Sequence, residues 1–248
     1  MHDERVSERS SVEEGQIVMP FYLVCDVSYS MSDDMQALNS GLDQLRRAIA
    51  TQPVVDDVAR ISIITFSDSA RVVMPLSQTS ETSTPALAPE GGTDYGSAFR
   101  ELARVIEDDR QNLKRQGYKI FRPCAFFLSD GEPLDGDWEQ TFRRTLTYDK
   151  KTGTGMKAHP IFVPFGFRDA PEQALRKLAY PPERGKWYHA RNTGVEKALE
   201  GILDVIMKTV VSSGLSVAPH SKPTLVLEKP SRESGITRGD SDYDEDYI

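Results

Sequence analysis

The polar residues best suited to chemistry in this chain are carboxylates and hydroxyls that lie just beyond apolar segments or beside glycines. Their oxygens are hard ligands, and without a neighbouring histidine or cysteine they suit Mg²⁺, Mn²⁺ or Ca²⁺ better than zinc. Three neutral hydroxyls and two carboxylates would leave a bound ion incompletely neutralised, so an anionic oxygen from outside could complete its shell. The candidate ligands are Asp26, Ser28, Ser30, Thr93 and Asp130.

These ligands come from three separate segments, so the fold must bring the segments together. Residues 21–25 and 125–128 are apolar throughout, which is typical of strands buried on both faces of a parallel sheet. Asp26 follows the first strand directly, and Asp130 follows the second after one serine. Ligands of open α/β sheets bind at the carboxyl ends of the strands. We therefore expect the two aspartates to lie side by side at that edge.

The order of predicted elements indicates a doubly wound α/β fold, with a mostly parallel central sheet and helices on both faces. Strands at 60–66 and 70–76 are joined by so short a turn that they must form an antiparallel hairpin. Pro75 lacks an N–H donor and places the second of these strands at the sheet edge. Apolar residues at steps of three and four predict helices on either side of the sheet.

We expect three parts in the chain: a flexible arm at 1–15, a folded domain at 16–214 and a disordered acidic tail at 215–248. The net charge of −8 resides in the two ends, because residues 1–14 carry −3 and residues 240–246 carry −5. The remainder is formally neutral, without the basic stripe typical of nucleic-acid binding. No apolar run is long enough to span a bilayer, and no signal peptide precedes the domain, so we expect a cytoplasmic protein without a membrane contact.

The patterns DVSYS, GGTD and SDGEP together resemble the metal-ion-dependent adhesion site of von Willebrand factor A (vWA) domains. The predicted order of strands and helices over residues 17–213, including the edge hairpin, is similar to that fold. SDGEP followed by Trp138 looks most like the bacterial TerY group, which is associated with tellurium-resistance and stress operons. All three patterns at these spacings are far more specific than DxSxS alone.

The resemblance implies a role for each candidate ligand. The three hydroxyls would contact Mg²⁺, or alternatively Mn²⁺ or Ca²⁺, and the two aspartates would bind the ion directly or through water. An Asp or Glu carboxylate of a protein partner would complete the shell. Many family members have glycine between the two serines, where this chain has a tyrosine. Candidates for a partner-binding rim are Tyr29, Tyr95, Glu132 and Trp138.

Two alternatives bear on this interpretation. An aspartate after the first strand also occurs in Mg²⁺-dependent phosphotransferases of the haloacid-dehalogenase type. Those enzymes carry a second aspartate two positions later, where this chain has Ser28, and no phosphate-binding GxxxxGK[ST] loop is present. The acidic residues of 240–246 could instead reach back as an internal metal ligand, or serve only solubility. We predict a non-enzymatic, Mg²⁺-dependent protein-binding module in a bacterial stress-response or defence assembly.

Overall fold

The computed structural model describes residues 15–191, 194–217 and 222–242, and their strands form one sheet. The strands are β1 (Ile17–Asp26), β2 (Ala59–Phe66), β3 (Ala70–Ser77), β4 (Lys119–Ile120), β5 (Cys124–Ser129), β6 (Ile161–Phe167), β7 (Lys186–Ala190) and β8 (Ile236–Asp240). Their order across the sheet is β3-β2-β1-β5-β6-β7-β8, and β4 pairs with β1 beside β5. β1 is central and parallel to its neighbours β2 and β5.

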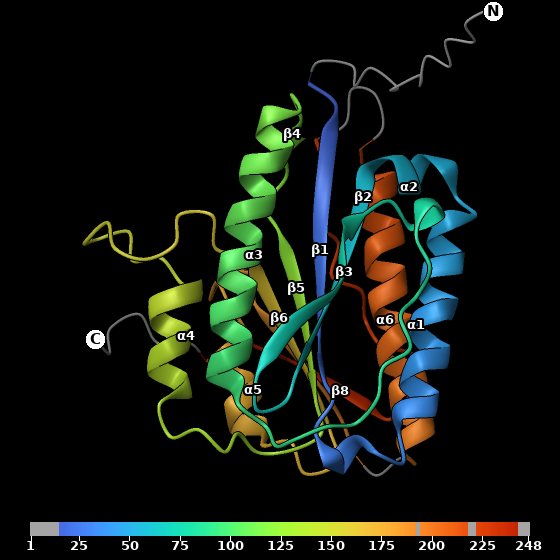
Figure 1. The fold of residues 1–248 in the computed structure, drawn as a ribbon, viewed down its shortest axis with the longest axis vertical. Helices are drawn as coiled ribbons and strands as arrows, with labels where there is room; N and C mark the ends of the chain where they lie inside the picture. Colours follow the sequence, from blue (N-terminus) through green and yellow to red (C-terminus); the bar gives the residue numbers. More distant parts are fainter. Residues whose placement is uncertain (1–14, 192–193, 218–221, 243–248) are drawn as a thin grey trace, which may run out of the picture.

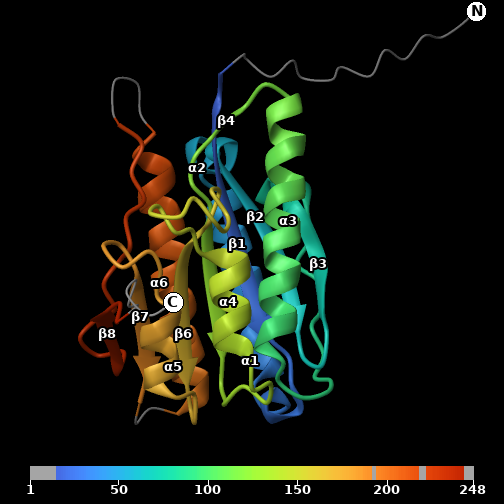
Figure 2. The same cartoon turned by 90° about the vertical axis from the view of Figure 1, so that its left-hand side faces the viewer.

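Helices cover both faces of this sheet (Figures 1 and 2). They are α1 (Met35–Ala50), α2 (Pro53–Val58), α3 (Tyr95–Arg115), α4 (Trp138–Leu146), α5 (Glu172–Leu178) and α6 (Val195–Leu215), with 3-10 turns η1 (Tyr29–Met31) and η2 (Thr79–Glu81). α1, α2 and α6 pack on one face, and α3 and α4 pack on the other. None of these described helices is both long and apolar enough to cross a membrane.

Alternate side chains of β1 enter two different cores because successive strand residues point to opposite faces. Phe21, Leu23 and Cys25 pack with α1 and α6, whereas Tyr22 and Val24 pack with α3 and α4. All five side chains are buried. The predicted fold class is thus confirmed, including the antiparallel β2–β3 hairpin at the edge.

The prediction of a structureless chain beyond residue 214 is wrong for residues 222–242. β8 pairs antiparallel with β7 and gives the sheet a second antiparallel edge. Leu225 and Ile236 are buried in the core that contains α6, and the Tyr188 hydroxyl donates to the carbonyl of Glu228 at 2.6 Å. Leu225 stands in the short apolar run 225–227, but Pro, Ser and charged residues separate it from Ile236, so no alternating period predicts β8. Backbone pairing, which needs no particular side chain, supplies the order instead.

The acidic residues at the end of the chain are also partly described. Asp240 forms an ion pair with Lys186, and Asp242 forms one with Arg176 at 2.9 Å. Lys186 begins β7, so Asp240 lies at the sheet end opposite to the carboxyl ends of the parallel strands. These two aspartates therefore do not act as the internal metal ligand considered above. The acids at 244–246 lie outside the described residues.

Ile236→Ala tests whether β8 belongs to the folded domain. Removing this buried side chain should lower the free energy of unfolding by about 2–3 kcal/mol, the usual cost of such a cavity. Thr237→Ala, on the exposed side of the same strand, should change it by less than about 1 kcal/mol. Urea denaturation followed by circular dichroism measures both. Equal midpoints for Ile236→Ala and the unsubstituted chain would contradict the placement of β8.

Candidate metal site

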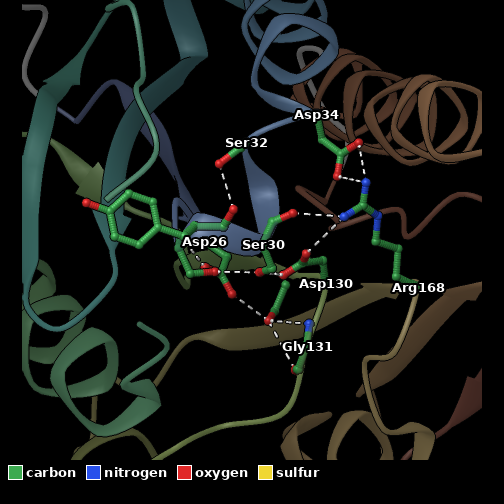
Figure 3. Close-up of polar contacts among 10 residues, drawn as sticks. Asp26, Ser30, Ser32, Asp34, Asp130, Gly131 and Arg168 are labelled. Atoms are coloured by element: carbon green, nitrogen blue, oxygen red, sulfur yellow. Dashed lines mark hydrogen bonds and ion pairs between the residues drawn. The ribbon is translucent and has the colours of Figure 1, made fainter. Parts of the chain in front are cut away.

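The candidate ligands Asp26 and Asp130 lie at the carboxyl ends of two paired strands. Asp26 is the last residue of β1, and Asp130 follows the end of β5. The register pairs Cys25 with Leu128, which brings the ends of the two strands to the same level. Figure 3 shows both side chains in one cluster of polar groups at this edge of the sheet, as the sequence predicts.

Three of the predicted ligands form a chain of hydrogen bonds. The Ser28 and Ser30 hydroxyl oxygens lie 2.9 Å apart, and the Ser30 hydroxyl donates to Oδ1 of Asp130 at 2.8 Å. The η1 turn immediately after β1 presents the two serines on the same side as the aspartate. Ser28 and Asp130 are buried, whereas Ser30 is exposed, so the cluster reaches the surface at Ser30.

Asp26 is a fully buried carboxylate that is compensated by neutral donors. Its Oδ1 accepts the backbone N–H of Ser28 at 2.9 Å, and its Oδ2 accepts the Ser129 hydroxyl at 2.8 Å. It makes no ion pair within the described part of the chain. Burial raises its pKa to about 6, and the hydrogen bonds only partly oppose that shift. A cation in this position would remove the cost of burying the charge.

Thr93 lies in the loop that packs between the two aspartate-bearing segments. The Gly91 carbonyl before it accepts the N–H of Tyr29 at 3.1 Å, and its own carbonyl accepts the N–H of Leu134 at 2.9 Å. Its side chain is buried, and its hydroxyl makes no hydrogen bond to a residue in the described ranges. Asp94 caps α3 by accepting the N–H of Ser97 at 2.7 Å. The backbone therefore fixes Thr93 beside the site and leaves its hydroxyl available.

Arg168 contacts the candidate ligands but lies outside the three sequence patterns that predict the site. It follows β6, and its guanidinium reaches across to the site (Figure 3). Nη1 donates to the carbonyl of Ser30 at 2.8 Å and lies 3.7 Å from Oδ2 of Asp130. Nη2 lies 2.9 and 2.8 Å from the two carboxylate oxygens of Asp34. No motif surrounds this arginine, so only the position of its strand in the sheet could have indicated it.

The predicted rim residues have different environments. Tyr29 is 69% exposed, and Glu132 is also exposed. Tyr95 is wholly buried, with its hydroxyl donating to the carbonyl of Gly131 at 3.0 Å, so its assignment to the rim is wrong. Trp138 is half-buried and packs edge-on against Tyr95. Leu134, which the sequence analysis did not single out, is 77% exposed. Tyr95, the first residue of α3, therefore packs in the core and does not lie on the surface.

The donor set fits a divalent cation in spacing and in charge. Ligands about 2.1 Å from an octahedral Mg²⁺ lie about 3 Å from their neighbours, and the Ser28–Ser30 and Ser30–Asp130 oxygen separations are 2.9 and 2.8 Å. The carboxylates of Asp26, Asp34 and Asp130 carry three negative charges when all are ionised. The guanidinium of Arg168, which contacts Asp34 and Asp130, offsets one of them and leaves two. Within the described residues, no three His, Cys, Asp or Glu side chains form a metal cluster. Metal binding here would therefore depend on the serine and threonine hydroxyls.

The raised pKa of Asp26 predicts a stability change with pH in the absence of metal. Between its ordinary value of 3.8 and about 6, the native state binds more protons than the unfolded state. Stability should therefore fall as pH rises through this window and stay low above it. Asp26→Asn removes this loss and should be more stable than the unsubstituted chain at pH 7 by up to about 3 kcal/mol, with little difference at pH 4.

Thermal unfolding in EDTA across this pH range measures that difference. An Asp26→Asn variant less stable than the unsubstituted chain at pH 7 would mean that the carboxylate is fully compensated by its neighbours. The description of Asp26 as a buried charge that its neutral donors compensate only in part would then be wrong.

Known proteins resemble this chain in fold. The family model for the von Willebrand factor type A domain matches residues 21–132. No curated protein matches the sequence. Three solved structures are similar over about four fifths of this chain: a von Willebrand factor type A protein from Catenulispora acidiphila, proximal thread matrix protein 1 of the mussel byssus with a zinc-occupied MIDAS motif, and the pilus adhesin SpaC from Lactobacillus rhamnosus GG.

The three similarities are close in fold and distant in sequence. The TM-scores are 0.53, 0.53 and 0.55, at identities of 16%, 11% and 14%. The matches cover 79%, 80% and 80% of this chain but only 43%, 49% and 31% of the respective solved chains. This chain therefore spans less than half the length of each, and the likeness concerns the fold alone. The chain therefore shares its fold with these structures, and its residues 21–132 match the model of the von Willebrand factor type A domain.

Proposed function

We propose that this domain is a Mg²⁺-dependent protein-binding module whose ion is held by Asp26, Ser28, Ser30, Thr93 and Asp130. The observation that carries the proposal is the spacing of the Ser28, Ser30 and Asp130 oxygens, which matches adjacent ligands of an octahedral ion. The bound ion would act as a Lewis acid that attracts an anionic oxygen. The donors of the chain would hold the ion from the buried side and leave its exposed side to a partner.

The surface around the site suits a protein partner that presents an Asp or Glu. Ser30 is exposed, and Tyr29 and Leu134 flank the Thr93 loop with exposed apolar side chains. Tyrosine, as at the exposed position 29, is one of the residue types enriched among binding hot spots. Among the structures of similar fold, one is a pilus adhesin, which supports a binding role, and another has zinc in its MIDAS motif, which supports a metal site. Mg²⁺, with Mn²⁺ or Ca²⁺ as alternatives, is the ion that an all-oxygen set favours.

A phosphotransferase function gains no support from this geometry. Ser28, at the position of the second aspartate in haloacid-dehalogenase-type enzymes, shares a hydrogen bond with Ser30 and cannot act as a carboxylic acid or base. Among the described residues, the nearest guanidinium, that of Arg168, is held by Asp34, Asp130 and the Ser30 carbonyl. Binding rather than catalysis is therefore the function we infer, in a bacterial stress-response assembly of the tellurium-resistance type or in a defence assembly.

Titration with Mn²⁺, a spectroscopic substitute for Mg²⁺, tests metal binding directly. Asp130→Asn keeps the shape of the side chain and removes one ligand charge, so we expect it to weaken Mn²⁺ binding at least tenfold. Asp33→Asn is the matched control, because Asp33 is exposed nearby and is not a proposed ligand. Electron paramagnetic resonance of free Mn²⁺ gives the affinities. Equal affinities for both variants and the unsubstituted chain would exclude the proposed site.

Partner binding has a separate test. A chain immobilised on beads should capture a protein from bacterial lysate in Mg²⁺ and release it in EDTA, and Asp130→Asn should capture none. Capture that survives both EDTA and the substitution would rule out the metal as the point of contact.

A further inference from the structure

Arg168 is a cation fixed inside the proposed metal site. We propose that its guanidinium bridges the loops after β1 and β5 in the absence of metal, and competes with the divalent ion for their negative charge. This inference rests on the proposed function and adds an intrinsic antagonist of metal binding. It concerns a residue outside the three sequence patterns that define the candidate site.

The backbone at Arg168 has an uncommon conformation. Its φ angle is 52°, the left-handed region that non-glycine residues seldom adopt. The surrounding chain holds it there, because the N–H of Asp169 donates to the Asp130 carbonyl at 3.1 Å and the N–H of Ala170 donates to the Phe167 carbonyl at 3.1 Å. Such a conformation persists only where its surroundings determine it. The loop after β6 is thus tied to the loop after β5, and its arginine projects toward the site.

The contacts of the guanidinium join two segments that are about a hundred residues apart in sequence. It binds Asp34 and the Ser30 carbonyl, both beyond β1, and lies beside Asp130, which follows β5. Asp34 and Asp130 are almost fully buried, and no other cationic side chain in the described residues pairs with either. A planar guanidinium can satisfy three acceptors at once, whereas a lysine ammonium is a point charge that cannot span them. The bridge therefore depends on an arginine at this position.

The same charge must oppose a metal ion at the neighbouring ligands. Asp130 would bind the ion while Arg168 lies 3.7 Å from one of its oxygens, so two cations would share one carboxylate. Like charges at such separations repel appreciably even when partly screened by water. Loss of the arginine should thus tighten metal binding by about tenfold while weakening the metal-free fold. Ordinary structural support would instead make both properties worse.

Two substitutions in the full chain separate charge from bridging. Arg168→Gln removes both, and Arg168→Lys keeps only the charge. In EDTA, we expect both variants to unfold several degrees below the unsubstituted chain. In Mn²⁺ titrations, Arg168→Gln should bind about tenfold more tightly, whereas Arg168→Lys should bind no more tightly than the unsubstituted chain. Arg104→Gln, which removes an exposed ion-paired arginine on α3, should change neither measurement.

The outcomes distinguish this inference from the function on which it rests. If the unsubstituted chain binds Mn²⁺ and Arg168→Gln binds it equally or more weakly, the competition is wrong and the metal site stands. If no variant binds Mn²⁺, the proposed function fails together with this inference. If Arg168→Gln is unfolded in EDTA, its recovery in Mn²⁺ supports the bridge. Failure to fold in Mn²⁺ as well would assign Arg168 to the core architecture and overturn the proposal.

Discussion

The burial of one carboxylate at the end of the central strand is the constraint on which the rest of the site depends. Asp26 ends β1, where the neighbouring strands and two helical layers exclude water. A charge in such surroundings needs compensation, and the chain supplies a backbone N–H and the Ser129 hydroxyl. These neutral donors leave the pKa of Asp26 raised. The site is thus arranged to gain stability from a cation.

The other donors follow from this arrangement. The turn after β1 presents Ser28 and Ser30, the parallel register brings Asp130 to the same level, and the backbone of the Thr93 loop is hydrogen-bonded to both segments. Arg168, which follows β6, neutralises part of the negative charge of Asp34 and Asp130. If the proposed ion binds, its affinity and the stability of the metal-free fold would be coupled through the same carboxylates. Such a domain could remain folded without the ion and still respond to it.

The strands and the hairpin could be predicted from local patterns in the sequence. Contacts between segments that are distant in sequence could not. The continuous apolar runs before Asp26 and Asp130 indicated buried parallel strands, and the short turn at residues 67–69 required a hairpin. Pro53 begins α2 at the first helical position, where proline needs no N–H partner. β8 and the buried position of Tyr95 depend on packing between distant segments. The role of Arg168 could not be predicted for the same reason, because its contacts come from the segments that follow β1 and β5.

Anomalous diffraction from crystals grown with MnCl₂ is the sharpest test of the metal site, because manganese can be located independently of the protein phases. We expect one strong peak beside the Ser28 and Ser30 hydroxyls and Asp130, at about 2.1–2.3 Å from ligand oxygens. We also expect an acidic oxygen from a neighbouring molecule or a buffer carboxylate, or a water molecule in its place, on the exposed side of the ion. Fully bound manganese elsewhere, with no peak among these residues, would mean that they do not form a metal site.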